Sequence, residues 1–97
     1  MSGYLLLREK KKTWNKFWFM VKELDTDIKI LYKFKESEDV AALDSVPLLG
    51  WYVSSISGPI DGHPEHLLFQ LTHPGLNSYI FKSEDELSKE RQGNSLS

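Results

Sequence analysis

Short apolar segments separated by turn residues recur along most of the chain. The segments at residues 3–8 and 14–23 are rich in aromatic and aliphatic side chains, and a charged stretch at residues 9–13 separates them. This arrangement predicts two strands joined as a hairpin with a flexible tip. Residues 28–35 then alternate between apolar and largely basic positions. Because successive side chains of a strand point to opposite faces, this period of two predicts a third strand with one mostly apolar and one mostly basic face.

The middle of the chain predicts a helical turn followed by two strands. Residues 36–44 lack the alternation of a strand, and Ser37 can cap a short helical turn there. Residues 45–49 and 51–56 are typical of two further strands. Pro47 suits an edge position, because proline has no N–H to donate to a neighbouring strand.

A loop rich in glycine and proline, residues 57–65, precedes the last predicted hairpin. Its strands are residues 66–72 and 77–82, which brings the total to seven. Between them, Pro74 presets φ and Gly75 permits the positive φ of a type II turn. Seven short strands place the chain in the mainly β class.

A short helix is predicted after the last strand. Ser83 and Glu86 match a capping box, in which each side chain satisfies a free amide of the first helical turn. From residue 84 to residue 91, however, only Leu87 is apolar. The helix therefore looks truncated, and we expect residues 92–97 to form a disordered tail.

The composition fits one small globular domain. The chain has 97 residues, of which 40% are hydrophobic and 12% aromatic. It contains no cysteine, so a disulfide framework and a metal site with thiolate ligands are both excluded. Its longest apolar runs have four and five residues, against the roughly 20 that a membrane-spanning helix needs. No secretory signal is recognisable, so we expect a cytoplasmic protein.

The charge is divided unevenly along the chain. Residues 1–16 hold five basic residues and one acidic residue, a net charge of +4. Residues 17–97 hold seven basic and thirteen acidic residues, a net charge of −6. The basic segment predicts an anionic surface as partner, whereas the acidic remainder argues against nucleic acid.

Several short motifs resemble those of a pleckstrin homology (PH) domain. The matching segments are residues 3–6, 14–21, 31–34, 47–50 and 79–82. More narrowly, Ser37-Glu38-Asp39-Val40-Ala41-Ala42-Leu43 leading into Pro47-Leu48-Leu49-Gly50 is similar to the C-terminal PH domain of the FYVE, RhoGEF and PH domain-containing (faciogenital dysplasia) family. The resemblance implies a PH domain at residues 1–91.

The resemblance also implies a fold and a context. The fold is a seven-stranded barrel of two near-orthogonal antiparallel sheets, closed at one end by a C-terminal helix. Family members plug that end with a tryptophan and several aliphatic residues, which this chain lacks after Leu87. The implied host protein is a guanine-nucleotide exchange factor that activates a Rho-family GTPase and remodels actin. The chain itself would be a non-catalytic targeting or regulatory module. It would be located in the cytoplasm, at the membrane periphery or on the cytoskeleton. Its association with the GTPase would occur only through the host protein.

The residues that bind phosphoinositides in the family are largely replaced here. Phosphoinositide-binding members carry a basic residue late in the first strand and a basic triplet in the second, where this chain has Leu7 and Asn15-Lys16-Phe17. We therefore expect weak electrostatic binding to anionic membrane lipids, since each basic residue near an anionic leaflet contributes about 1 kcal/mol. The candidate lipid contacts are Arg8, Lys10, Lys11, Lys12, Lys16 and Lys33. The alternative is a protein–protein interaction module with no significant phosphoinositide binding.

No enzyme, metal or cofactor is expected. The three histidines, His63, His66 and His73, have no cysteine to complete a structural zinc site. Acidic pairs such as Glu38 and Asp39 lie in turns with no pocket-forming segment around them. The tryptophans lie in separate strands, which favours a role in the core over nucleic-acid stacking.

Overall fold

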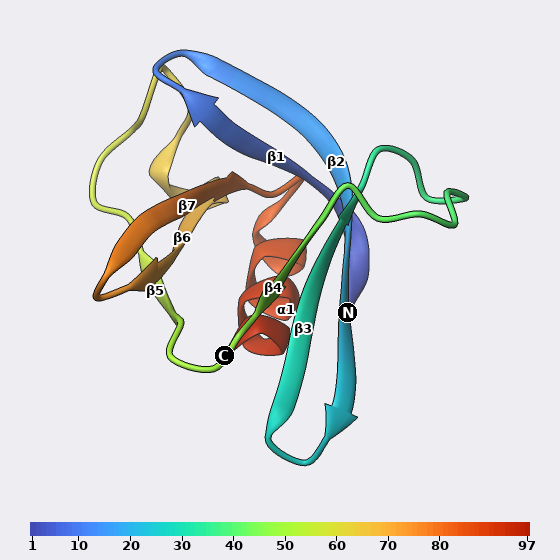
Figure 1. Ribbon diagram of the computed structural model, residues 1–97. Coiled ribbons are helices and arrows are strands. Elements are labelled where there is room, and N and C mark those ends of the chain that lie inside the picture. The colour runs from blue at the N-terminus through green and yellow to red at the C-terminus, as the bar shows by residue number, and fades with distance from the viewer.

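The computed structural model describes all 97 residues and contains seven antiparallel strands and one α-helix (Figure 1). The strands are β1 (Ser2–Lys10), β2 (Thr13–Asp25), β3 (Ile28–Phe34), β4 (Asp44–Pro47), β5 (Tyr52–Ser55), β6 (Leu68–His73) and β7 (Leu76–Lys82). A 3₁₀ turn, η1 (Glu65–Leu67), precedes β6, and the helix α1 (Glu86–Leu96) follows β7. The predicted mainly β class and the count of seven strands are confirmed.

The strands form one sheet in the order β4-β3-β2-β1-β7-β6-β5. Its two halves meet where β1 pairs with β7, and this pairing comprises two residue pairs, Leu6 with Lys82 and Leu7 with Phe81. Figure 1 shows the two halves folded toward each other, with α1 lying against the space between them. The two sheets that were expected are thus joined into a single bent sheet.

The core lies on the inner face of this bent sheet. Phe81 is at its centre, with the Phe19 ring 5.3 Å away edge-on and the Phe69 ring 5.1 Å away in a stack. Nine buried residues form the cluster: Leu5, Leu7, Phe19, Leu31, Leu48, Phe69, Leu71, Phe81 and Leu96. Both halves of the sheet and the helix contribute to it, so none of the three can bury its apolar side chains without the others.

The strand predicted at residues 28–35 is present as β3, but only Phe34 of its more apolar row is buried, and the other row faces the main core. Val21 pairs with Leu31 and Phe19 with Lys33, which puts the row containing Leu31 on the core side. Leu31 is buried, whereas Ile28 on the other row is 50% exposed. A strand inside a sheet takes its orientation from its neighbours' register, because a shift of one residue would reverse every side chain.

The helical turn expected at residues 36–44 does not form. The Glu36 amide instead donates to Asp39 Oδ2 at 3.0 Å, and the Asp39 amide donates to the Glu36 carbonyl at 3.2 Å, which closes a turn. Val40 is 98% exposed. A single helical turn gains little without an apolar face to bury, and the large apolar residues here, Val40 and Leu43, are both exposed.

The turn between β6 and β7 also differs from the expectation. Gly75 does not adopt a positive φ, so the turn is not type II. Its amide donates to His73 Nδ1 at 3.0 Å, a side-chain contact that the turn residues alone do not specify.

The helix begins later than the capping-box pattern predicts. Asp85 is the N-cap, and its Oδ1 accepts a hydrogen bond from the Ser88 amide at 2.7 Å. Ser83 is buried instead, and its Oγ donates to Gln92 Oε1 at 2.8 Å. The hydroxyl expected to cap the helix therefore ties the end of β7 to the side of α1.

The helix also ends later than expected. It continues through Leu96, so the segment at residues 92–97 that was expected to be a disordered tail belongs largely to α1. Leu96 is 2% exposed and belongs to the core. Leu87, the one apolar residue between positions 84 and 91, is 62% exposed. The scarcity of apolar residues from 84 to 91 therefore does not truncate the helix, because its buried residues, Gln92 and Leu96, lie one to three turns after Leu87.

Candidate functional site

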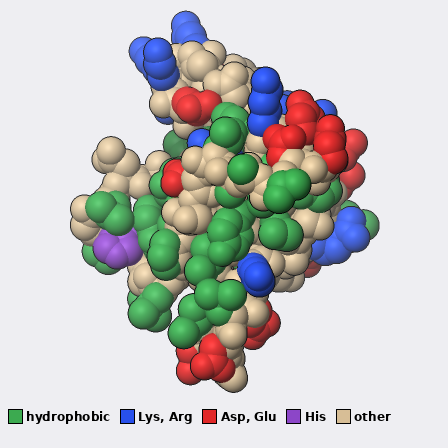
Figure 2. All heavy atoms as spheres, turned by 45° about the vertical axis from the view of Figure 1, so that its right-hand side comes forward, with side chains coloured by type: hydrophobic (Ala, Val, Ile, Leu, Met, Phe, Trp, Pro, Cys, Tyr) green, Lys and Arg blue, Asp and Glu red, His purple; other side chains and the backbone are tan.

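The β1–β2 hairpin ends in three consecutive lysines. Arg8 pairs with Trp14 and Lys10 with Thr13, which leaves Lys11 and Lys12 as the two-residue turn. Lys10, Lys11 and Lys12 are all exposed. Figure 2 shows Lys and Arg side chains projecting at the top of the molecule, where Figure 1 places this hairpin.

Asp61, from the loop between β5 and β6, binds this end of the hairpin. Its Oδ2 accepts hydrogen bonds from Arg8 Nε at 2.8 Å, from Trp14 Nε1 at 2.9 Å and from the Lys12 amide at 3.0 Å. The Asp61 side chain is 9% exposed. The pKa of Asp61 is lowered to about 2, chiefly by the hydrogen bond from Arg8 and to a lesser extent by those from Trp14 and the Lys12 amide. The tip expected to be flexible is thus tethered at Lys12.

The loop is shaped to present this carboxylate. Ile60 and His63 exchange backbone hydrogen bonds of 3.1 and 2.8 Å, and between them Asp61 and Gly62 have φ of 51° and 83°. Two successive positive φ angles are the requirement of a type I′ turn, for which Asp-Gly is a preferred pair. The His63 ring then contacts Trp14 edge-on, with the ring centroids 4.7 Å apart.

Arg8 is therefore engaged within the protein. It forms the single salt bridge of the structure, with Asp61, and this partner raises the pKa of the Arg8 guanidinium. Of the candidate lipid contacts, Arg8 is thus already paired with a carboxylate, whereas Lys10, Lys11 and Lys12 have no such partner. No local sequence pattern links Asp61 to Arg8, because the two residues are 53 positions apart in the chain.

The remaining two candidates lie on opposite faces of the sheet. Lys16 Nζ is 4.5 Å from the centroid of the Tyr4 ring on the outer face. Lys33 Nζ is 4.5 Å from the centroid of the Phe17 ring, and Lys33 lines a small cavity with core residues such as Phe19. The six candidates therefore do not converge on one pocket, and the structure brings together only the three lysines of the tip.

An acidic residue, Glu9, contacts Asn15, one of the positions that the family resemblance assigns to headgroup binding. Leu7 pairs with Asn15 and is buried in the core. Asn15 Nδ2 donates to Glu9 Oε1 at 2.8 Å. A phosphate approaching this point would meet an amide already in use and a carboxylate, instead of the bidentate donors that bind phosphate well.

Two other properties of the molecule bear on its function. None of its helices has the length and apolar composition needed to span a bilayer. No group of three His, Cys, Asp or Glu side chains is arranged to hold a metal ion.

Comparison with known proteins identifies relatives of the whole chain. The family model of the PH domain matches residues 1–91. FYVE, RhoGEF and PH domain-containing protein 6 of Mus musculus is 44% identical over 92 residues, which are 94% of this chain and 6% of that protein. Protein 5 of the same name from Homo sapiens is 38% identical over 99 residues, again 94% of this chain and 6% of the relative.

A solved structure agrees with these relatives. The solution structure of the PH domain of mouse Ethanol Decreased 4 protein superimposes with a TM-score of 0.81 at 38% identity, covering 99% of this chain and 82% of the other. The chain thus matches one domain of larger proteins, and it spans only a small part of the curated relatives.

Proposed function

Because the chain belongs to the PH domain family, we propose that it is a non-catalytic targeting module that binds anionic membrane lipids weakly through the tip of the β1–β2 hairpin. The resemblance to FYVE, RhoGEF and PH domain-containing proteins that the sequence predicts is confirmed. Proteins of the PH family bind phosphoinositides or other proteins, and the arrangement of charges favours a lipid surface here.

The observation that carries this proposal is the set of three exposed lysines without carboxylate partners, Lys10, Lys11 and Lys12. They project from the end of the hairpin, which Asp61 holds at the Lys12 amide and at Trp14. At about 1 kcal/mol for each basic residue near an anionic leaflet, the three contribute about 3 kcal/mol, enough for reversible association. Fixing the hairpin also reduces the entropy lost when the tip docks.

This binding depends on surface charge and not on headgroup stereochemistry. The positions that recognise phosphoinositides in other members hold Leu7, Asn15 and Phe17, and Glu9 adds a negative charge beside them. Arg8 is neutralised by Asp61, and Lys16 and Lys33 point away from each other. The lysines of the tip therefore interact with any anionic lipid at similar strength, and salt weakens the interaction.

The host protein is a Rho-family guanine-nucleotide exchange factor that acts on the actin cytoskeleton from the cytoplasm. The names and identities of the relatives support this part of the proposal. The exchange reaction belongs to another part of the host, since the PH domain occupies this chain from residue 1 to residue 91. A module with weak lipid affinity suits a host that carries further membrane-directed domains, because linked weak contacts reinforce one another.

Liposome co-sedimentation tests the lipid-binding proposal. Phosphatidylserine vesicles, with and without phosphoinositide, are offered at low and physiological salt to the wild type and to the triple variant Lys10→Ala, Lys11→Ala, Lys12→Ala. We expect the triple variant to partition about 100-fold more weakly, from about 1 kcal/mol for each lysine. The wild type should bind less as salt rises. Phosphoinositide should increase binding no more than an equal negative charge supplied by phosphatidylserine.

The matched control is Lys22→Ala, Lys35→Ala, Lys89→Ala, which removes the same charge from exposed or half-buried positions outside the tip. This control should sediment nearly as the wild type does. Equal losses in both triple variants would show that net charge alone matters, and no binding of the wild type at either salt would leave a protein-binding module as the better account.

A further inference from the structure

The two edge strands of the sheet differ in how their free edges are protected. β4 begins at Asp44 and ends at Pro47, and both a charge and a proline discourage the addition of another strand. β5 has the sequence Tyr-Val-Ser-Ser, with neither a charge nor a proline. Because β5 pairs only with β6, one row of its backbone donors and acceptors has no partner in the sheet.

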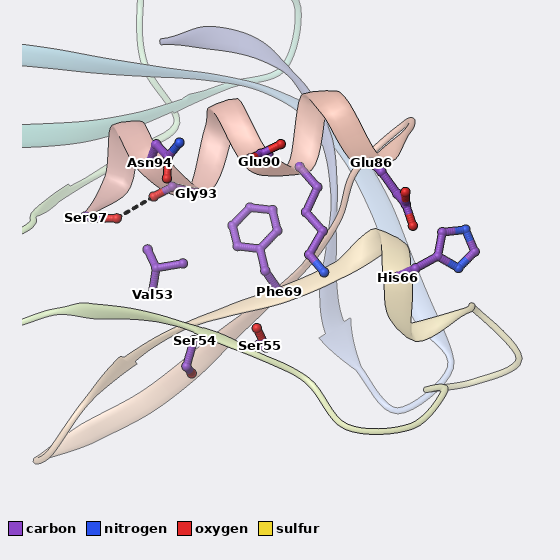
Figure 3. A pocket seen from close by; sticks show the side chains of 11 residues that line it. Val53, Ser54, Ser55, His66, Phe69, Glu86, Glu90, Gly93, Asn94 and Ser97 are labelled. Carbon is purple, nitrogen blue, oxygen red and sulfur yellow. Dashed lines mark hydrogen bonds between the residues drawn. The ribbon is translucent and has the colours of Figure 1, made fainter.

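A groove of about 410 Å³ runs beside this edge, between β5 and α1. Figure 3 shows the helix on one side of the groove, the segment with Ser54 and Ser55 on the other, and the Phe69 ring between them. Phe69 and Val53 are the two hydrophobic residues of the lining. A Cβ on Gly93 would lie 3.6 Å from Val53 Cγ1. The absence of a side chain at Gly93 therefore leaves space between the helix and β5 at this point.

The helical wall is acidic. Glu86 and Glu90, one helical turn apart, line the groove, are exposed and form no salt bridge. Lys89 also lines the groove, which leaves one negative charge in excess there, and Glu84 and Asp85 precede Glu86 at the start of the helix. The groove therefore combines an unpaired strand edge, a negatively charged wall and two apolar residues, the half-buried Val53 and the buried Phe69.

We propose that this groove binds an extended peptide of a partner protein, which pairs with β5 as an eighth strand and places a lysine or arginine beside Glu86 and Glu90. Main-chain hydrogen bonds to the edge supply affinity, and alternate side chains that enter the groove supply specificity. A peptide side chain directed inward meets Val53 and Phe69, so a small apolar residue fits there.

A second copy of this chain is a poorer occupant of the groove than a basic peptide. Residues 49–60, which surround β5, contain no lysine or arginine. Pairing of β5 with β5 of another copy would therefore leave the carboxylates of Glu86 and Glu90 without counter-charges. The peptide site also goes beyond the lipid-binding proposal, because none of its residues belongs to the β1–β2 hairpin.

Selection from a displayed library of random peptides of about seven residues tests this proposal on the full chain without vesicles. We expect the enriched peptides to contain Lys or Arg within an extended, proline-free sequence. In two-dimensional NMR spectra, the enriched peptide should shift the amides of Val53, Ser54 and Ser55 and slow the hydrogen exchange of those whose N–H faces the free edge, while the amides of the hairpin tip stay unchanged.

Charge reversal provides the sharpest variant. Glu86→Lys with Glu90→Lys should weaken the enriched peptide about tenfold, from two exposed ion pairs, and should improve binding of the same peptide with its basic residues changed to Glu. The matched control Glu23→Lys with Glu38→Lys makes the same charge change at exposed positions elsewhere and should leave binding unchanged. Gly93→Leu, which fills the groove without altering charge, should also weaken binding.

Four results would overturn the peptide proposal. They are the absence of any enriched peptide, equal binding to the charge-reversed protein and its control, amide shifts located away from β5 and α1, and self-association of the free chain through β5 in sedimentation equilibrium. None of them bears on the lysines of the hairpin tip, so the lipid-binding proposal stands or fails separately.

Discussion

The two ends of the bent sheet are held together by different chemistry. At the hairpin end, the carboxylate of Asp61 accepts four hydrogen bonds, two from Arg8 and one each from the Lys12 amide and Trp14. At the helix end, Leu96 is buried in the core and Gly93 lies close to Val53. Hydrogen bonds fix direction at the surface, whereas apolar burial supplies most of the folding free energy. The hairpin end is therefore suited to presenting charge, and the helix end to holding the fold.

The largest effect should come from the helix end. Leu96→Ala removes a side chain that is 2% exposed, and a large-to-small core substitution of this kind costs about 2–5 kcal/mol of unfolding free energy. In a domain whose total stability is about 5–15 kcal/mol, that is a severe loss. Chemical denaturation followed by tryptophan fluorescence measures it.

Leu87→Ala is the matched control in the same helix, because Leu87 is 62% exposed. It should change the unfolding free energy by no more than about 0.5 kcal/mol. Equal costs for the two substitutions would show that the last turn of α1 does not pack as described.

A substitution at the hairpin end should have a smaller effect, and it should strengthen lipid binding instead of weakening the fold. Asp61→Asn keeps an acceptor near Trp14 and Lys12 but removes the charge that neutralises Arg8. One additional uncompensated cation near an anionic leaflet is expected to strengthen partitioning about fivefold, from about 1 kcal/mol. Liposome co-sedimentation with phosphatidylserine vesicles measures this change.

Asp27→Asn is the control for that experiment, since Asp27 is an exposed acid in the β2–β3 turn. It changes the net charge by the same amount but not at the hairpin. If both variants gain equally, the effect is one of overall charge, and the local pairing of Arg8 with Asp61 is irrelevant to lipid binding.

The smallest expected effect is a difference in the pH dependence of stability. The pKa of Asp61 in the folded protein is about 2, below its ordinary value of 3.8, so its ionised form favours folding. This contribution is fully present above the ordinary value and is lost as the pH falls from about 4 towards 2. Unfolding free energy measured across this range should decrease less steeply in Asp61→Asn than in the wild type. Parallel curves would contradict the shifted pKa.

Most of the strands could be predicted from the sequence because their signal is local. Alternation, turn residues and proline positions depend on a few neighbouring residues, and the seven strands lie close to the predicted segments. Leu7 and Asn15, two of the positions that the family resemblance assigns to phosphoinositide binding, pair with each other across β1 and β2.

The helix shows where a local signal misleads. A capping-box pattern at Ser83 was available, but burial of Ser83 against Gln92 and capping by Asp85 decided the start of α1. The scarcity of apolar residues suggested a truncated helix, yet one leucine at the correct position, Leu96, is sufficient to reach the core. The position of an apolar residue relative to the sheet counts for more than the number of such residues in the helix.

The sequence by itself determined the mainly β class, the seven strands, the basic hairpin and the family resemblance, because each depends on short-range patterns or on residue identity. Only the tertiary structure decided which face of β3 is buried, that Arg8 is paired and the three lysines of the tip are not, and that a groove lies beside β5. These properties join residues far apart in the chain, such as Arg8 and Asp61, 53 residues apart. Contacts of this kind are set by how the sheet bends and pairs, and no local pattern specifies that.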